Sequence, residues 1–563
     1  MKFEEFKVKV PNAKKVMEKV NKFQEDFKNA KDAKEAKRII DKANKYLEGI
    51  SSDVAVIQIH FSIDTRDQKI RKAYEKVNQT MPLVSEAING LNIAMATSKF
   101  RSELEVMYGK HLFDMIDNSL KTFKPEIIPE MIKENELVMK YESILGDAQI
   151  EYNGQIYNLS QMSKFKTDKD REVRRLASLA TDKWGDEHAL EIENIYGELV
   201  KVRDTMAKKL GFKSYTEVAY LNMGRLDYNA DMVKKYRDQI YKEVTPIATL
   251  LYKKQKRRLG YKKMHYYDWG LSFLSGNPTP VGDEKVLVEH AQKMYDEMSK
   301  ETGEFMHFMR DNHLLDLTAK PGKQPGGYMS YIPKYKSPFI FSNFNGTSGD
   351  VDVLTHEFGH ALQAYLTRNM KIGDYRSPGM EACEIHSMSM EFLAWPWMEL
   401  FFDDANKYRF SHLASAITFI PYGAAVDEFQ HWVYDNVNAT NKEREDKWNE
   451  IDKQYRPMLD NSDSSFYSRG RRWLLQSHIF SSPFYYIDYT LAQVCAFQFL
   501  VESRKNKDKA WKKYLKYSKL GGRYPFITLL EKAHIKVPFY EGNLKRIMRP
   551  VKKIILSFDD TKF

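Results

Sequence analysis

The sequence predicts a mainly α-helical fold with a few short strands. Apolar residues recur at helical spacing over most of the 563 residues. Strand-like alternation or turn chemistry stands out in three short segments, residues 53–65, 147–159 and 338–344. No internal repeat or low-complexity tract interrupts this pattern. We therefore expect a globular protein in which helix follows helix.

The expected helices follow from periodicity, and each expected strand has its own signal. In chain order the clearest helices cover residues 32–47, 70–96, 100–120, 168–181, 188–210, 232–258, 284–313, 405–417, 425–437, 442–458, 484–500 and 509–520. Residues 53–65 alternate apolar and polar side chains and are rich in β-branched residues, which favours a strand. Asn153-Gly154 lies between two alternating runs and predicts a hairpin. Residues 338–344 form a short apolar strand.

Composition excludes several classes of protein. The chain is 42% hydrophobic and 29% charged, as in an ordinary globular protein. Its net charge of +11 is spread widely, and the basic runs 253–258 and 504–513 are expected to be solvated helix faces. The first ten residues lack an apolar signal core, residues 392–402 are too short to span a bilayer, and the two cysteines are expected to be buried thiols. We expect a cytoplasmic protein with no nucleic-acid or membrane partner.

The chemistry of the chain centres on residues 351–370, which read VDVLTHEFGHALQAYLTRNM. His356 and His360 are separated by about one helical turn, so both imidazoles leave the same face and can bind one metal ion. Glu357 follows the first histidine directly, where its carboxylate can reach a metal-bound water rather than the metal. The motif predicts a metal-dependent hydrolase, although an exposed helix with two solvated histidines is the alternative.

A catalytic zinc usually takes three protein ligands and leaves a fourth position for water. Glu384 follows His360 with 23 residues between them, after a Gly- and Pro-containing turn that allows an antiparallel return. It is therefore the expected third ligand. Glu381 and His386 lie on the same predicted helix and compete for this place.

Two further carboxylates lie near the motif. Asp352 precedes His356 by four residues and is well placed to accept a hydrogen bond from a ligand's other ring nitrogen. Glu391 follows Glu384 by seven residues and faces the same side of its helix. We expect it to support a ligand or to form a salt bridge.

A second cluster lies further along the chain. Tyr485, Tyr486 and Tyr489 occur within five residues, with His478 upstream. The simplest interpretation is aromatic core. The functional one is that His478 and one or two phenols donate hydrogen bonds to the oxyanion of a tetrahedral intermediate. Tyr486 and Tyr489 are three residues apart, so a helix would present both on one side.

With these motifs, the chain resembles the M3 family of zinc metallopeptidases, within the thimet oligopeptidase superfamily. It is most similar to the bacterial oligoendopeptidase F and Pz-peptidase-like members. The resemblance covers about residues 326–499 and rests on FIFSNFNGTSGDVDVLTHEFGHALQ, EIHSMSMEFL and HIFSSPFYYIDYTLAQ.

The resemblance implies a zinc-dependent oligoendopeptidase that hydrolyses internal bonds of short unstructured peptides. It implies one zinc ion per chain, bound by His356, His360 and Glu384, with Glu357 as the general base. It assigns oxyanion binding to Tyr486 and Tyr489, with His478 nearby. Thimet-type relatives have a glycine-rich loop before these tyrosines, whereas this chain has Ser481-Ser482-Pro483. Whether Tyr485 or Tyr486 pairs with Tyr489 therefore stays open.

The resemblance also implies an architecture. We expect an elongated multi-helix body with a deep substrate channel and a small β-sheet beside the motif helix. Residues 1–185 would form a helical region covering the channel, and residues 186–563 the catalytic region. The strand 338–344 would pair with the extended backbone of an oligopeptide substrate. The protein is expected to be a monomer or a homodimer.

Two other classes of function remain at this point. A helical scaffold protein would keep the motif around a structural metal, or without a metal. A carboxypeptidase or aminopeptidase would use the same metal chemistry on a free peptide end. Arg469–Arg472 keeps the first of these exopeptidases open, because a carboxypeptidase needs a cation for the terminal carboxylate.

Overall fold

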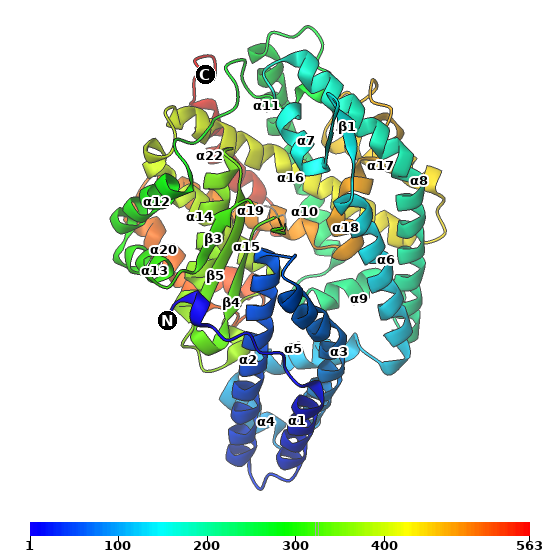
Figure 1. Ribbon diagram of the computed structural model, residues 1–563, viewed down its shortest axis with the longest axis vertical. Helices are drawn as coiled ribbons and strands as arrows, with labels where there is room; N and C mark the ends of the chain where they lie inside the picture. Colours follow the sequence, from blue (N-terminus) through cyan, green and yellow to red (C-terminus); the bar gives the residue numbers. More distant parts are fainter. Residues whose placement is uncertain (321, 325) are drawn as a thin grey trace. The chain divides into compact units, whose positions relative to one another are not determined.

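Helices form most of the chain in the computed structural model, which describes residues 1–320, 322–324 and 326–563 (Figure 1). The predicted mainly α-helical fold is confirmed. The chain divides into two compact units, each assembled from three segments. Unit 1 comprises Met1–Leu120, Thr279–Asp403 and Glu502–Ile535, and unit 2 comprises Lys121–Pro278, Asp404–Val501 and Lys536–Phe563.

Unit 1 combines two groups of helices with a three-stranded sheet. Its helices are α1 (Ala13–Lys28), α2 (Ala33–Ile63), α3 (Gln68–Ala96), α4 (Arg101–Tyr108), α5 (Lys110–Lys121), α12 (Glu284–Met298), α13 (Lys300–Asp311), α14 (Gly349–Thr367), α15 (Met380–Leu393), α20 (Lys507–Leu520) and α21 (Phe526–Lys532). The first group, α1–α5, surrounds its own apolar core, which includes Val20, Ala36, Leu104 and Phe113.

The sheet of unit 1 has the strand order β3 (Leu315–Thr318), β5 (Ser337–Phe344), β4 (Tyr328–Ile332) and lies beside α14 (Figure 1). β5 pairs with β3 in parallel and with β4 in antiparallel orientation. The strand predicted at 338–344 is therefore confirmed. Its predicted pairing with substrate is wrong, because both of its edges already hydrogen-bond to neighbouring strands. Only the edge strands of this sheet, β3 and β4, leave a side open for another backbone.

The strand expected at residues 53–65 is wrong, because these residues form the second half of α2. Asp32 caps the start of α2 by accepting a hydrogen bond from the backbone N–H of Glu35 at 2.8 Å. The helix continues for 31 residues, and Val56 and Ile59 are fully buried on it three residues apart. Burial of this helical face overrides the preference of β-branched residues for strands.

Unit 2 consists of helices and one hairpin. Its helices are α6 (Ile128–Gly146), α7 (Leu159–Lys166), α8 (Arg171–Leu210), α9 (Tyr215–Asn222), α10 (Ala230–Glu243), α11 (Thr245–Arg258), α16 (Ala405–Asp435), α17 (Asn441–Tyr455), α18 (Ser477–Ser481), α19 (Tyr486–Ser503) and α22 (Asn543–Leu556). The boundary predicted between residues 185 and 186 falls inside α8, and the two-domain division stays a prediction. Among the described residues, no helix is both long and apolar enough to cross a bilayer.

The hairpin of unit 2 confirms the prediction for residues 147–159. β1 (Ile150–Tyr152) pairs antiparallel with β2 (Gln155–Tyr157). Asn153 and Gly154 connect the strands with φ angles of 50° and 73°. Positive φ at both positions is what a type I′ turn requires, and Asn-Gly adopts it at little cost.

Within unit 1, α14 and α15 pack closely where α14 has a glycine. A Cβ atom added to Gly359 would lie 2.6 Å from the carbonyl oxygen of His386 and 2.8 Å from Cα of Ser387. Both atoms belong to the backbone of α15, so a rotamer change cannot relieve the overlap. The helices can keep this distance only with glycine at position 359.

We predict that Gly359→Ala destabilises the protein by about 1–3 kcal/mol, the usual cost of overpacking. Gly49→Ala is the matched control, because Gly49 is helical, lies in the same unit and has no atom within 4 Å of an added Cβ. That change should stabilise by roughly 0.5–1 kcal/mol through helix propensity. Thermal unfolding of both variants would check this. Equal shifts in the two midpoints would contradict the packing argument.

Candidate metal centre

The loop before α14 fixes the start of the motif helix. The carboxylate of Asp350 accepts hydrogen bonds from the backbone N–H groups of Asn345, at 2.9 and 3.1 Å, and of Gly346, at 2.7 Å. Further along, Phe358 stacks on Tyr295 of α12 with ring centroids 3.5 Å apart and packs against Phe305 of α13. The buried face of α14 is thus held by unit 1, and the opposite face carries the histidines.

α14 and α15 bring the three predicted ligands together. Nε2 of His356 lies 3.3 Å and Nε2 of His360 lies 3.5 Å from Oε2 of Glu384. One ligand atom from each residue lies within 4.8 Å of the others. Bonds of about 2.0–2.1 Å in a tetrahedron separate ligand atoms by about 3.3 Å, so these separations suit a zinc ion. This is the only such group of histidine, cysteine and carboxylate side chains in the described part of the chain.

The two competing ligands do not belong to this group. His386 is buried on α15, its Nδ1 lies 3.3 Å from the carbonyl oxygen of Cys383, and its ring stacks on Tyr517 at 4.5 Å. Burial lowers the pKa of His386 to about 3, so it is neutral at physiological pH. Glu381 lies in the first turn of α15. The geometry therefore favours Glu384 as the third ligand.

The ligand carboxylate is held in its charged form. Burial raises the pKa of Glu384, but hydrogen bonds and charge interactions with His356 and His360 outweigh burial and hold it well below its usual range. Burial likewise lowers the pKa of His356, but Glu384 and Glu391 outweigh burial and raise it well above its usual value. The carboxylate of Glu384 thus offers a negatively charged ligand to a metal cation.

Glu357 lies one residue from the first ligand and is almost fully buried, with 7% of its surface exposed. Its Oε2 atom is inaccessible and has no hydrogen-bond partner. Burial raises its pKa above the usual value for a glutamate. A buried carboxylate with a raised pKa is a better proton acceptor than a solvated one.

Supporting groups orient the ligands. Oε1 of Glu391 lies 2.7 Å from Nδ1 of His356, which leaves Nε2 to face the ion. This matches the predicted supporting role of Glu391. The hydroxyl of Ser387 donates to Oε2 of Glu384 at 3.1 Å. Asp352 lies half-buried in the first turn of α14, and its supporting role stays a prediction.

Three supporting residues have no signal in the sequence. They are Ser387 on α15 and two tyrosines on α20. Tyr514 donates a hydrogen bond to the carbonyl oxygen of His386 at 3.0 Å, and Tyr517 donates one to the carbonyl oxygen of Ala382 at 2.8 Å. Both tyrosines are buried and hold the backbone of α15. They lie over 120 residues from α15 in the chain, so only the fold connects them with the ligands.

The tyrosine and histidine cluster lies in unit 2, at the start of α19. The ring of His478 lies 5.1 Å from that of Tyr486 and 5.7 Å from that of Tyr489, and its Nε2 is 3.5 Å from the hydroxyl of Tyr489. α19 contains both tyrosines, as the spacing predicted. Tyr485 precedes the helix and is buried, whereas Tyr486 and Tyr489 are half-buried. This difference favours Tyr486 over Tyr485 as the partner of Tyr489.

A buried arginine fixes the turn into α19. Phe484 has a φ of 67°, an unusual left-handed conformation for an aromatic residue. Its N–H donates to the side chain of Gln430 at 2.8 Å, and its carbonyl oxygen accepts from Arg225 at 2.7 Å. Arg225 also pairs with Asp488 in the first turn of α19 at 2.7 Å. These contacts hold the backbone in place beside the tyrosines.

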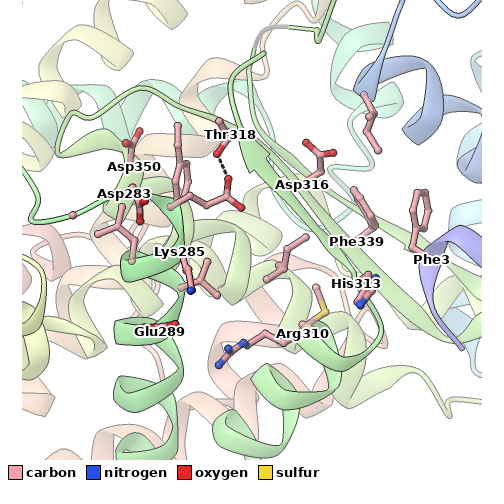
Figure 2. Close-up of a pocket in the computed structure, with 18 of the residues that line it drawn as sticks. Phe3, Asp283, Lys285, Glu289, Arg310, His313, Asp316, Thr318, Phe339 and Asp350 are labelled. Carbon is pink, nitrogen blue, oxygen red and sulfur yellow. Dashed lines mark hydrogen bonds between the residues drawn. The ribbon is translucent and has the colours of Figure 1, made fainter. Parts of the chain in front are cut away.

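Unit 1 contains another cavity, of about 1220 Å³, between α12, β3 and the N-terminal residues (Figure 2). Three of its carboxylates are engaged in structural contacts. Asp350 binds backbone N–H groups, Asp316 pairs with Lys320 at 3.0 Å, and Glu284 accepts a hydrogen bond from Thr318, drawn as a dashed line in Figure 2. The three candidate metal ligands are not among its described lining residues. We assign this cavity no catalytic role.

Comparisons with known proteins agree with this site. Residues 3–123 match the model of the Peptidase M3 N-terminal domain, and residues 283–549 match that of Peptidase family M3. Oligopeptidase PepF of Bacillus subtilis is 21% identical over 66% of this chain and 55% of its own length. The Oligoendopeptidase F homolog of Borreliella burgdorferi is 24% identical over 51% of this chain and 49% of its own length. The match thus spans about half the length of these curated relatives.

Solved structures of similar peptidases match over the whole chain. The structure titled PZ peptidase A with inhibitor 2 has 44% sequence identity and a TM-score of 0.95, and all of both chains are covered. Oligoendopeptidase-F from Enterococcus faecium shares the fold at 14% identity, with a TM-score of 0.64 and 97% of both chains covered. From these matches and the geometry of α14 and α15, the chain belongs to peptidase family M3.

Proposed function

We propose that the protein is a zinc-dependent oligoendopeptidase that hydrolyses internal bonds of short, unstructured peptides. One observation carries the proposal: His356, His360 and Glu384 place three ligand atoms within 4.8 Å, with Glu357 buried directly beside them. The names of the relatives, oligopeptidase and oligoendopeptidase, support the same reaction.

His356, His360 and Glu384 would hold one zinc ion. Two imidazoles and one carboxylate form a ligand set typical of catalytic zinc in hydrolases. When bound, zinc supplies a Lewis acid that lowers the pKa of water and polarises a carbonyl group. Glu391 and Ser387 keep His356 and Glu384 in their ligating orientations.

Glu357 would act as the general base and then as the general acid. Its carboxylate accepts a proton from the attacking water and passes it to the nitrogen of the leaving amine. Its raised pKa suits the first step, because it makes the carboxylate a stronger base toward the attacking water than an ordinary glutamate would be.

His478, Tyr486 and Tyr489 would stabilise the oxyanion of the tetrahedral intermediate. Hydroxyl and imidazole N–H groups donate hydrogen bonds to the developing negative charge. Their clustering at the start of α19, with Tyr489 and His478 in contact, supports a shared role. The buried ion pair of Arg225 and Asp488 keeps this end of α19 rigid.

The substrate would be an extended oligopeptide. Because β5 is already paired on both sides, an added peptide strand requires an edge strand of the sheet. A cytoplasmic location and a monomeric or homodimeric state stay predictions from the sequence. An exopeptidase would use the same centre but would need a free peptide end.

Cleavage of an end-blocked, internally quenched peptide of about ten residues tests the proposal, because blocked ends exclude exopeptidases. We expect cleavage at an internal bond, its loss on chelation and its return with zinc. Protein shown to hold one zinc ion per chain that leaves this peptide intact would instead be an exopeptidase or a scaffold.

We predict that Glu357→Gln keeps zinc but loses turnover, because glutamine has the same shape and cannot accept the proton. Metal content by mass spectrometry and kcat on the quenched peptide are the measurements. The control is the zinc stoichiometry of the wild-type protein purified in parallel. A variant with near-normal kcat would remove Glu357 from the base role.

We predict that Tyr489→Phe lowers kcat by about 10²-fold, the usual loss for one oxyanion donor. Tyr485→Phe and Tyr486→Phe form a matched pair, and we expect the larger loss of kcat for Tyr486, since Tyr485 is buried. Steady-state kinetics on one peptide would compare all three. An unchanged kcat for Tyr489→Phe would assign that tyrosine to packing.

A further inference from the structure

Unit 2 contains a cavity of about 360 Å³ whose lining is strongly basic. α11, α16 and the short 3-10 helices Tyr467–Arg469 and Arg472–Leu475 contribute to its walls. The described lining residues include Arg258, Arg456 and Arg472 but no aspartate or glutamate. The cavity itself therefore offers cationic donors without a matching carboxylate.

Two of the three arginines have their charge balanced behind the cavity wall. Arg258 pairs with Asp560 at 2.5 Å, and Arg456 forms a close pair with Asp452 on α17. In the described part of the chain, no carboxylate oxygen lies within 4 Å of a guanidinium nitrogen of Arg472. Arg472 is thus the arginine of this cavity that forms no ion pair, and it shares the charge of Asp452 with Arg456.

The environment of Arg472 makes an unpaired charge costly. Its guanidinium carbon lies 4.8 Å from the ring centroid of Tyr422 and 5.8 Å from that of Tyr467, and its Nε atom is inaccessible and without an acceptor. Aromatic faces stabilise a cation only in part, and a desolvated charge needs a partner of opposite sign. An anionic ligand would supply it.

Neighbouring groups add neutral donors. Nε1 of Trp269 and Oγ of Ser411 belong to lining residues, and both atoms are buried without a hydrogen-bond partner. The planar guanidinium of Arg472 matches the two oxygens of a carboxylate, which accept hydrogen bonds in parallel, and the two neutral donors belong to the same cavity lining.

A chain of side-chain contacts leads from Arg472 in the cavity lining to the tyrosine and histidine cluster. The hydroxyl of Tyr422, whose ring contacts Arg472, donates to Oε1 of Gln476 at 2.7 Å. Nε2 of Gln476 lies 2.9 Å from Nδ1 of His478, which in turn contacts Tyr489. A group bound at Arg472 is therefore connected through side chains of one unit to the proposed oxyanion donors.

We infer that this cavity binds a carboxylate of the peptide substrate, the carboxyl terminus, through Arg472. The inference rests on the proposed peptidase function and extends it to substrate choice. Peptides with a free carboxyl end would bind more tightly than the same peptides with an amide end.

Three quenched peptides of one sequence test the inference: one with a free carboxyl end, one with a carboxamide end, and one amidated peptide that ends in glutamate. The proteins are the wild type, Arg472→Gln, Arg472→Lys and the matched control Arg469→Gln. Arg469 is exposed and three positions away. Thermal midpoints and zinc content would show that each variant is folded and loaded.

For the wild type we expect the lowest KM with the free acid. Arg472→Gln should raise that KM by about 10- to 100-fold, the usual loss for a charge-assisted hydrogen bond, and should raise the KM of the amide peptide much less. Arg472→Lys should keep part of the preference for the free acid over the amide, and Arg469→Gln should keep all of it.

Equal KM values for acid and amide in the wild type, or an acid preference that survives in Arg472→Gln, would overturn the inference. A low KM for the amidated peptide that ends in glutamate would show that the cavity recognises an acidic side chain and not the carboxyl terminus.

Failure of the proposed function would be visible separately. If the wild type cleaves none of the three peptides, binding of an N-acetyl amino acid and of its amide can be compared by thermal shift at constant ionic strength. A shift with the acid alone, lost in Arg472→Gln, would support the carboxylate site without peptidase activity. The inference would be overturned if the acid causes no shift, or if inorganic phosphate causes the same shift and the shift with the acid persists in Arg472→Gln.

Discussion

The candidate metal centre depends on one close approach between two helices. Glu384 reaches the two imidazoles only because α15 lies directly against α14 at Gly359, where any side chain would overlap the backbone of His386 and Ser387. Separations of 3.3 and 3.5 Å between ligand atoms leave little tolerance, since a shift of half an ångström would spoil a tetrahedral site. The glycine within the motif is therefore as important to the centre as the residues that bind the ion.

The surrounding structure keeps that approach fixed. Tyr514 and Tyr517 of α20 hold two carbonyl oxygens of α15, and Phe358 stacks on Tyr295 of α12 and packs against Phe305 of α13. Backbone groups held in this way cannot relax when a ligand residue is replaced. These contacts help to keep the site assembled although burial raises the pKa of Glu357 and opposes the ionised form of Glu384.

Buried arginines have the corresponding role in unit 2. Arg225 joins the strained backbone at Phe484 to Asp488 and thereby orients the first turn of α19. Arg472 differs because it has aromatic neighbours and, among the described residues, forms no ion pair, since Asp452 already pairs with Arg456. The first arrangement is complete and serves structure, whereas the second becomes complete only with an anion, and this contrast separates a structural arginine from a binding one.

The amino-acid sequence was sufficient to predict the helical class, the hairpin at Asn153-Gly154, and the motif helix with its two histidines and Glu357. These features depend on spacing within a few residues, which chain geometry converts directly into a shared face or a turn. The preference for Glu384 over Glu381 and His386, the support from Ser387, Tyr514 and Tyr517, and the central position of β5 were decided only by the tertiary structure. So was the helical state of residues 53–65, because burial against neighbouring helices outweighs local strand preference. Contacts between distant segments carry no local pattern, and the packing of α14 on α15 is the contact on which the candidate site depends.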